Sequence, residues 1–191
     1  MSLILAISGP AAVGKTTLCE RLIDEFKDSL SRLITATTRP PRFGEKEGVA
    51  YYFLSKSEFD QKLEQGEFLE HEIIHGNKYG VLKKTVLEAQ SRGVNILLNI
   101  DVNGAESLRN FCAINESLRG CLKTIFIRPK SLKELEKRMH KRATEDAQQR
   151  QTRLENAKSE LERDHEFDFI LESTDKESDY QRVRSLYLTL D

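Results

Sequence analysis

The sequence has few cysteines, no excess of charge of either sign and no long hydrophobic run. Its cysteines, Cys19, Cys112 and Cys121, form no C-x-x-C pair and no even set, which favours a reducing, cytoplasmic compartment. The formal net charge of -1 gives no overall reason to expect a nucleic-acid partner. No apolar segment is long enough to span a bilayer. We therefore expect a cytoplasmic protein that binds neither nucleic acid nor membrane.

The composition is that of a globular protein with one sizeable core. The chain has 191 residues, of which 32% are charged and 38% are hydrophobic. Short apolar segments alternate along it with segments of helical spacing, without internal repeats or low-complexity linkers. This alternation predicts an α/β fold with three layers around a mainly parallel sheet.

The beginning of the chain carries a specific phosphate-binding motif. Residues 1–7 are apolar, and residues 9–16 fit the pattern G-x-x-x-x-G-K-[ST]. The glycines permit close backbone approach, so that N–H groups can turn inward around a polyphosphate. Lys15 can reach the β and γ phosphates, and the Thr16 hydroxyl can bind Mg²⁺. Helical spacing over about residues 15–27 places a helix N-terminus at the phosphates. The alternative is a chance glycine turn between a strand and a helix.

A second candidate phosphate site lies in the segment T-A-T-T-R-P-P-R-F-G-E at residues 35–45. Its prolines and Gly44 exclude a regular helix, so Arg39 and Arg42 are held on stiff, irregular backbone. Two arginines held in this way can contact one phosphate from two directions. A solvated loop with two unremarkable arginines explains the same residues equally well. The segment by itself leaves both alternatives open.

Two other motifs lie in contexts that do not suit them. Residues 71–75, H-E-I-I-H, fit a zinc-binding pattern that requires a helix. Residues 68–75 alternate and predict a strand, on which the two histidines would lie roughly 13 Å apart. Residues 77–80, N-K-Y-G, begin like the guanine-binding pattern N-K-x-D, but Gly80 replaces the required carboxylate. Neither motif is expected to form its site.

Polar residues follow the expected strand at residues 94–100. Asn99 and Asp101 lie near its carboxyl end, where parallel sheets after a phosphate loop meet Mg²⁺ and substrate. Further strands are expected at residues 33–34, 122–127 and 167–171. Further helices are expected at residues 58–63, 82–90 and 105–111, and two more should begin at residue 131, with a capping box to Glu134, and at residue 178.

Residues 133–163 are helical and highly charged, with a break at residues 144–146. They form either a solvated helix pair or a mobile lid that carries arginines over bound phosphates.

Together these motifs resemble guanylate kinase, the nucleoside monophosphate kinase family that acts on GMP. The resemblance rests on G-P-A-A-V-G-K-T-T, T-A-T-T-R-P-P-R-F-G-E, G-E-F-L-E-H-E-I-I-H-G-N-K-Y-G, L-L-N-I-D-V-N-G and R-M-H-K-R-A-T-E-D, in order over nearly the whole chain. It implies a three-layer α/β P-loop kinase core with a mainly parallel sheet, an inserted small mixed α/β GMP-binding region and a helical lid. The implied boundaries are core at residues 1–34, 87–129 and 161–191, GMP-binding region at 35–86, and lid at 130–160.

The resemblance also implies roles for individual residues. The catalytic positions are Lys15, Arg138, Arg142 and Arg153, and the ATP-binding positions are Gly9, Pro10, Ala11, Ala12, Val13, Gly14, Lys15, Thr16 and Thr17. The GMP-binding positions are Thr35, Arg39, Arg42, Tyr51, Glu70, Tyr79 and Asp101. Thr16 matches the Mg²⁺ ligand, with Asn99 or Asp101 placed to act through water.

The implied reaction is Mg²⁺-assisted transfer of a phosphoryl group from ATP to GMP, and to dGMP, in purine nucleotide metabolism. The partners implied are these small molecules, and the protein is expected to be a monomer or a homodimer. Guanine presents N1–H and an amino group as donors, so the carboxylates of Glu70 and Asp101 are suitable acceptors. Adenine would place a ring-nitrogen acceptor against a carboxylate and would be repelled.

Three positions depart from the guanylate kinase pattern. Val81 replaces a Ser or Thr whose hydroxyl helps to bind guanine, Asn99 replaces an Asp near the metal, and residues 172–175 replace the usual Asn-Asp. Two alternatives follow from these departures: a non-catalytic guanylate-kinase-like binding module, and a related kinase with a different phosphorylated acceptor. The intact phosphate loop weighs against the first, and the two arginines with Glu70 weigh against the second.

Overall fold

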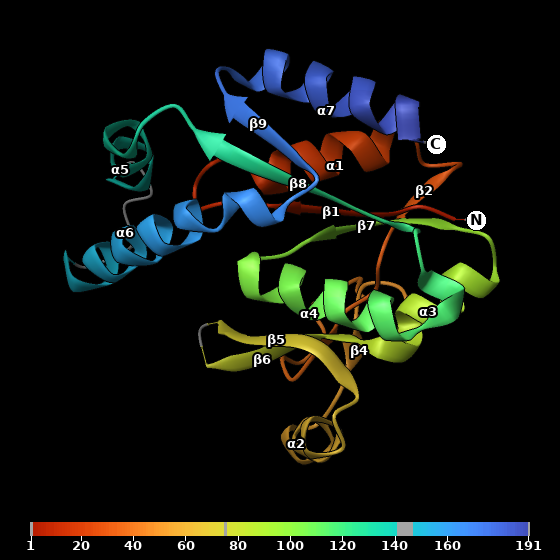
Figure 1. Cartoon of the computed structure of the whole chain (residues 1–191). Coiled ribbons are helices and arrows are strands. Elements are labelled where there is room, and N and C mark those ends of the chain that lie inside the picture. Colours follow the sequence, from red (N-terminus) through yellow and green to blue (C-terminus); the bar gives the residue numbers. More distant parts are fainter. Residues whose placement is uncertain (1, 75, 141–146, 191) are drawn as a thin grey trace.

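A computed structural model of the chain describes residues 2–74, 76–140 and 147–190. Within these residues the strands form two sheets (Figure 1). The larger sheet has the order β2-β7-β1-β8-β9, and its neighbouring strands are parallel. Its strands are β1 (Ile4–Ser8), β2 (Leu30–Arg32), β7 (Asn95–Asn99), β8 (Leu122–Pro129) and β9 (Phe169–Ser173). The predicted α/β fold with a mainly parallel sheet is therefore confirmed.

Helices cover both faces of the larger sheet (Figure 1). One face carries α1 (Lys15–Glu25) and α7 (Lys176–Leu190), and the other carries α3 (Lys83–Ser91) and α4 (Val102–Ile114). The central strand β1 is buried on both sides. Leu5 and Ile7 pack on the α1 side, whereas Ile4 and Ala6 pack on the α4 side. Successive side chains of a strand point to opposite faces, so a strand covered on both faces has a continuous apolar sequence.

The smaller sheet has the order β4-β3-β6-β5 and lies beneath α4 in Figure 1. Its strands are β3 (Ala36–Thr37), β4 (Tyr52–Phe53), β5 (Phe68–Ile74) and β6 (Asn77–Leu82), and α2 (Lys56–Glu64) packs on it. Phe59 of α2 stacks on Phe68 of β5 with the ring centroids 4.2 Å apart. A capping box between Ser55 and Glu58 begins α2. This sheet has its own small apolar core, separate from the two cores of the larger sheet.

The charged segment after β8 forms α5 (Leu132–His140) and α6 (Ala147–Glu162), with the short 3₁₀ helices η1 (Glu116–Leu118) and η2 (Asp164–Glu166) elsewhere. The Ser131 hydroxyl accepts a hydrogen bond from the Glu134 N–H at 3.2 Å, which is one half of the predicted capping box, while the Glu134 carboxylate pairs with Arg138. Arg163, just after α6, donates to Asn103 at 2.8 Å and pairs with Glu106 at 2.9 Å. These contacts anchor the base of α6 to α4. The expected break at residues 144–146 lies outside the described residues.

Several predicted boundaries were wrong. The strand expected at residues 33–34 is Leu30–Arg32, because the chain leaves the larger sheet after Arg32 to enter the smaller one. Strand β6, which completes a hairpin with β5, was not predicted. The last helix begins two residues before the expected position, since Asp175 accepts hydrogen bonds from the Glu177 and Ser178 N–H groups. None of the described helices is long and apolar enough to cross a membrane.

Candidate active site

The phosphate loop joins β1 to α1 in a conformation that requires glycine at its start. Gly9 has a φ of 134°, and a Cβ at this position would collide with the carbonyl oxygen of Ile127 in β8. The Lys15 ammonium turns back over the loop and donates to the carbonyls of Gly9 and Pro10, the latter at 3.1 Å. The predicted order of strand, loop and helix is therefore confirmed, and the N-terminus of α1 begins at Lys15.

Lys15 is surrounded by carboxylates from several elements. Burial lowers the pKa of Lys15, and this effect is opposed by Glu160 of α6, Asp101 before α4 and Glu72 of β5. Burial of the Glu160 carboxyl group raises its pKa to about 7. One of the Glu160 carboxylate oxygens has no hydrogen-bond partner among the described residues. The loop thus holds a partly buried ammonium whose charge is opposed by acidic side chains from three other elements.

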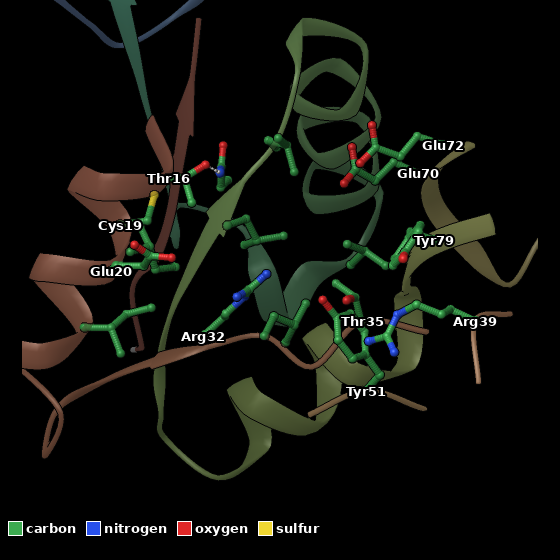
Figure 2. A pocket seen from close by; sticks show the side chains of 18 of the residues that line it. Thr16, Cys19, Glu20, Arg32, Thr35, Arg39, Tyr51, Glu70, Glu72 and Tyr79 are labelled. Carbon is green, nitrogen blue, oxygen red and sulfur yellow. Dashed lines mark hydrogen bonds between the residues drawn. The ribbon is translucent and has the colours of Figure 1, made fainter. Parts of the chain in front are cut away.

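A cavity of about 390 Å³ separates α1 from the smaller sheet (Figure 2). Among the side chains expected to bind GMP, it is lined by Thr35, Arg39, Arg42, Tyr51, Glu70 and Tyr79. Thr16, Cys19 and Glu20 of α1 line its opposite wall. The structure therefore brings together residues from the irregular segment at 35–45 and from both strands of the β5–β6 hairpin.

A second cavity of about 640 Å³ adjoins the first and includes the phosphate loop in its wall. It is lined by Gly9, Lys15, Asn99, Asp101 and Glu160, among others. Glu70, Glu72 and Asn99 line both this cavity and the first one, so the two meet at β5 and at the carboxyl end of β7. Asp101 lies in this second cavity. We call this second cavity the loop cavity, and the first one, which contains Arg39 and Arg42, the arginine cavity.

The irregular segment holds Arg39 firmly in the wall of the arginine cavity. Its guanidinium pairs with Glu45 at 2.8 Å and donates to the Pro40 carbonyl at 2.7 Å. It also lies 5.4 Å from the centroid of the Tyr51 ring, and Tyr51 meets Tyr79 edge to face at 6.0 Å. Glu45 accepts a second hydrogen bond, from the Arg42 N–H at 2.6 Å. Arg39 is therefore a positioned residue, which the solvated-loop alternative did not require.

Glu70 points from β5 toward the first turn of α4 (Figure 2). Burial raises the pKa of Glu70 to about 8, and the nearby carboxylates of Asp101 and Glu72 contribute to the shift. Asp101 caps α4, since its Oδ1 accepts a hydrogen bond from the Gly104 N–H at 2.7 Å. A Cβ at residue 104 would overlap Oε2 of Glu70. The glycine thus leaves the space that the Glu70 carboxylate occupies.

Arg138 of α5 reaches the phosphate loop. It donates to the Val13 carbonyl at 3.3 Å and pairs with Glu134 on its own helix at 2.6 Å. Of the other arginines expected in the lid, Arg153 lies on α6, but its side chain is outside the described part of the chain. Arg142 is outside the described residues altogether. The structure therefore places one of the expected lid arginines at the loop.

The comparisons with known proteins agree with this geometry. The family model described as guanylate kinase matches residues 1–188. The chain belongs to the guanylate kinase family. A guanylate kinase of Clostridioides difficile is 34% identical over 184 residues, which cover 96% of this chain and 86% of that protein. Guanylate kinase 1 of Oryza sativa is 38% identical over 98% of this chain, which spans only 48% of the rice protein.

Solved structures show the same fold. The crystal structure of guanylate kinase from Anaplasma phagocytophilum has a TM-score of 0.67 and 29% identity, over 98% of this chain and 85% of that one. The SH3-kinase fragment of tight junction protein 3 has a TM-score of 0.51 at 10% identity, and the match covers 98% of this chain and 57% of that one. The second likeness concerns the fold alone.

Residues that depart from the guanylate kinase pattern lie in the cavity wall, beside Thr16 and at the start of α7. Val81 is 4% exposed and lies opposite Glu70 in the β5–β6 hairpin, so it forms an apolar part of the cavity wall. Asn99 donates from its amide to the Thr16 hydroxyl at 3.3 Å. At the end of β9, the Ser173 hydroxyl and the Thr174 N–H both donate to Asp179 of α7. These last contacts stabilise the start of α7.

The zinc pattern at residues 71–75 begins on a strand and not on a helix, as far as the structure describes it. His71 lies on strand β5, as predicted, while His75 is outside the described residues. Within residues 2–74, 76–140 and 147–190, no group of three or more His, Cys, Asp or Glu side chains is placed to hold a metal ion. A Mg²⁺ ion held chiefly by nucleotide phosphates and water needs no such group.

Sequence patterns missed several residues that line these cavities in the guanylate kinase fold. Glu72 follows Glu70 by two residues on β5, so the strand period could have placed both on one face. Glu45 could have been noticed from its spacing to Arg42. Glu160 and Arg32 carried no local signal, since the packing of α6 and β2 alone brings them to the cavities.

A first prediction concerns Gly104, whose lack of a side chain makes room for Glu70. The Gly104→Ala variant should fold, since alanine favours the helix by about 1 kcal/mol and the atom it meets is the end of a flexible side chain. The displaced carboxylate should raise the KM for GMP by about 10-fold to 100-fold. Steady-state kinetics measures this, with the exposed Asn110→Ala on the same helix as control. An unchanged KM for GMP, or an equal rise for ATP, would contradict it.

Proposed function

We propose that this member of the guanylate kinase family phosphorylates GMP, and dGMP, with ATP as the donor. The observation that carries the proposal is the meeting of the two cavities at Glu70 and Asn99. One contains a phosphate loop with a buried lysine, and the other contains a positioned arginine with tyrosines and a buried carboxylate. Two phosphorylated substrates can therefore face each other across this junction.

In the proposed arrangement each wall has a separate task. The loop N–H groups and Lys15 hold the ATP phosphates, while Arg39, Arg42, Tyr51 and Tyr79 hold the phosphate of GMP. Glu70, which lines the same cavity as Thr35, and Asp101 in the adjoining loop cavity accept hydrogen bonds from the guanine N1–H and amino groups. The guanine-binding set and the phosphate-binding set thus fix the acceptor at both ends.

The chemistry needs no general base. The GMP phosphate is already an anionic nucleophile, so the protein contributes alignment of two polyanions and stabilisation of the charge on the transferred group. We assign the charge stabilisation to Lys15 and Arg138, with Arg142 and Arg153 of the proposed lid at residues 130–160. Closing of the lid would exclude water from the reacting groups.

Thr16 and Asn99 are the residues that would hold Mg²⁺. The Thr16 hydroxyl and the Asn99 amide are adjacent, and together they offer oxygen ligands of the hard type that Mg²⁺ prefers. When bound, the ion would neutralise part of the negative charge of the phosphate groups. Asp101 is exposed nearby and could act on the same ion through water.

The deciding experiment measures ADP formation in a coupled assay with GMP, dGMP, AMP, UMP and CMP in parallel. Rapid turnover with GMP and dGMP alone is the expected result. Turnover with another acceptor would identify a related kinase of different specificity. The absence of turnover with every nucleotide, together with measurable peptide binding, would favour a non-catalytic module.

The amide at Asn99 leads to a second prediction. A carboxylate at this position would add a charge beside the metal, so Asn99→Asp should raise activity at low Mg²⁺ and have little effect at saturating Mg²⁺. The measurement is kcat/KM as a function of Mg²⁺ concentration. Asn110→Asp, an exposed change on α4, controls for added negative charge. Identical Mg²⁺ curves for the wild type and Asn99→Asp would remove Asn99 from the metal site.

A further inference from the structure

Arg32 lines the arginine cavity, and none of the motifs or family positions described above includes it. It is the last residue of β2, the strand at one edge of the larger sheet. The strand pairs in parallel with β7, with Leu30 opposite Asn95 and Arg32 opposite Leu97. Side chains two residues apart share a face, so Arg32 lies on the same face as Leu30.

This register places the guanidinium at the mouth of the cavity. Leu30 is 1% exposed and belongs to the apolar core beneath α1, whereas Arg32, one step further toward the carboxyl end, is exposed. Figure 2 shows the Arg32 side chain extending into the space between α1 and the smaller sheet. In parallel α/β sheets, ligands bind at this end of the strands.

The charge of Arg32 is available for a ligand. In the described part of the chain, its guanidinium forms no hydrogen bond or ion pair. Arg39, by contrast, is committed to Glu45 and to the Pro40 carbonyl. Arg32 contributes a positive field at the thiol of Cys19, which lines the same wall. An anion that enters the cavity would therefore gain a contact with Arg32 without breaking an existing one.

We propose that Arg32 is a further substrate-contact residue, which binds the phosphate of the acceptor nucleotide from the side opposite Arg39 and Arg42. This inference rests on the proposed function. The cavity that Arg32 lines also contains Thr35 and Tyr51, but not Gly9 or Lys15, so the acceptor phosphate is favoured over the donor phosphates. A planar guanidinium can bind two phosphate oxygens at once. Because Arg32 belongs to the larger sheet, its contact with the GMP phosphate links the acceptor nucleotide to the sheet that also carries the phosphate loop.

The test compares GMP with guanosine, which lacks the phosphate. Calorimetry measures the affinity of the full chain for both ligands, in the wild type, Arg32→Gln, Arg32→Lys and the control Arg119→Gln. Arg119 is exposed and lies after η1, away from both cavities. We expect Arg32→Gln to weaken GMP binding by about 10-fold or more, as for a lost hydrogen bond to a charged group. Guanosine binding should not change, and Arg32→Lys should restore part of the loss.

Steady-state kinetics provides the second readout. The KM for GMP should rise in Arg32→Gln while the KM for ATP stays constant. GMP affinity equal to that of Arg119→Gln, an equal loss for guanosine, or a rise confined to the KM for ATP would each overturn the proposal. If Arg32→Gln fails to fold, the comparison of the two ligands in Arg32→Lys decides. Absence of GMP turnover in the wild type would instead refute the proposed function, and the binding comparison would still test Arg32.

Discussion

The Lys15→Met variant is expected to lose about 10²-fold to 10³-fold in kcat, with little change in GMP affinity. A loss of this size is typical when one preorganised group that stabilises transition-state charge is removed. Methionine keeps the length and the apolar stem of lysine but has no charge. Lys15 lines the loop cavity but not the arginine cavity, so the acceptor site should remain intact.

The measurement is the coupled ADP assay at saturating substrates, with GMP affinity determined separately. Lys27→Met, an exposed change just after α1, serves as the matched control. Removal of the Lys15 charge also leaves Glu160 and Asp101 without their counter-charge, so thermal unfolding should be followed as well. An unchanged kcat, or an equal loss of GMP affinity, would exclude the assigned role of Lys15.

The second large effect is expected for Glu70→Gln, which should raise the KM for GMP by about 10²-fold. An ionised carboxylate accepts with both oxygens, whereas the amide turns one donor toward the donors of guanine. The KM for ATP should stay constant, because the proposed contacts of Glu70 are with guanine and not with the ATP phosphates. Steady-state kinetics with both substrates measures the change, and the exposed Glu64→Gln is the control. A KM for GMP equal to that of the control would rule out guanine recognition by Glu70.

The pH dependence of the same variant provides an independent check. Burial raises the pKa of Glu70 to about 8, so binding of guanine donors requires loss of a proton. The KM for GMP should therefore fall as the pH rises from about 6 through 8 in the wild type, and this dependence should weaken in Glu70→Gln. Parallel pH profiles for the two proteins would contradict the proposed ionisation.

Rising pH should favour GMP binding but lower the contribution of Glu70 to the stability of the folded protein. Between the ordinary pKa of 4.5 and the folded value of about 8, the folded state retains a proton that the unfolded state releases. The contribution of Glu70 to the free energy of unfolding therefore falls with rising pH, by at most about 1.4 kcal/mol per pH unit. The Tm of Glu70→Gln relative to the wild type should accordingly increase from pH 5 to pH 8.

The phosphate loop and the irregular arginine segment could be predicted because their conformations depend on neighbouring residues. Gly9, Lys15, Arg39 and Arg42 sit in short segments whose glycine and proline spacing restricts the backbone locally. The position of β2 and the existence of β6 were missed because strand pairing supplies the hydrogen bonds that define a strand. Those partners are remote in sequence, as the pairing of Leu30 with Asn95 illustrates.

The sequence by itself predicted the α/β class and the phosphate loop, and its resemblance to guanylate kinase implied roles for Arg39, Arg42 and Glu70. Only the tertiary structure decided that Glu70 fills the space left by Gly104, that the Glu160 carboxylate faces the charge of Lys15, and that Arg32 lines the arginine cavity. The physical reason is the range of the interactions. Loop conformation is set by short-range sterics, whereas the charge and burial around a side chain are set by elements that meet through packing of distant segments.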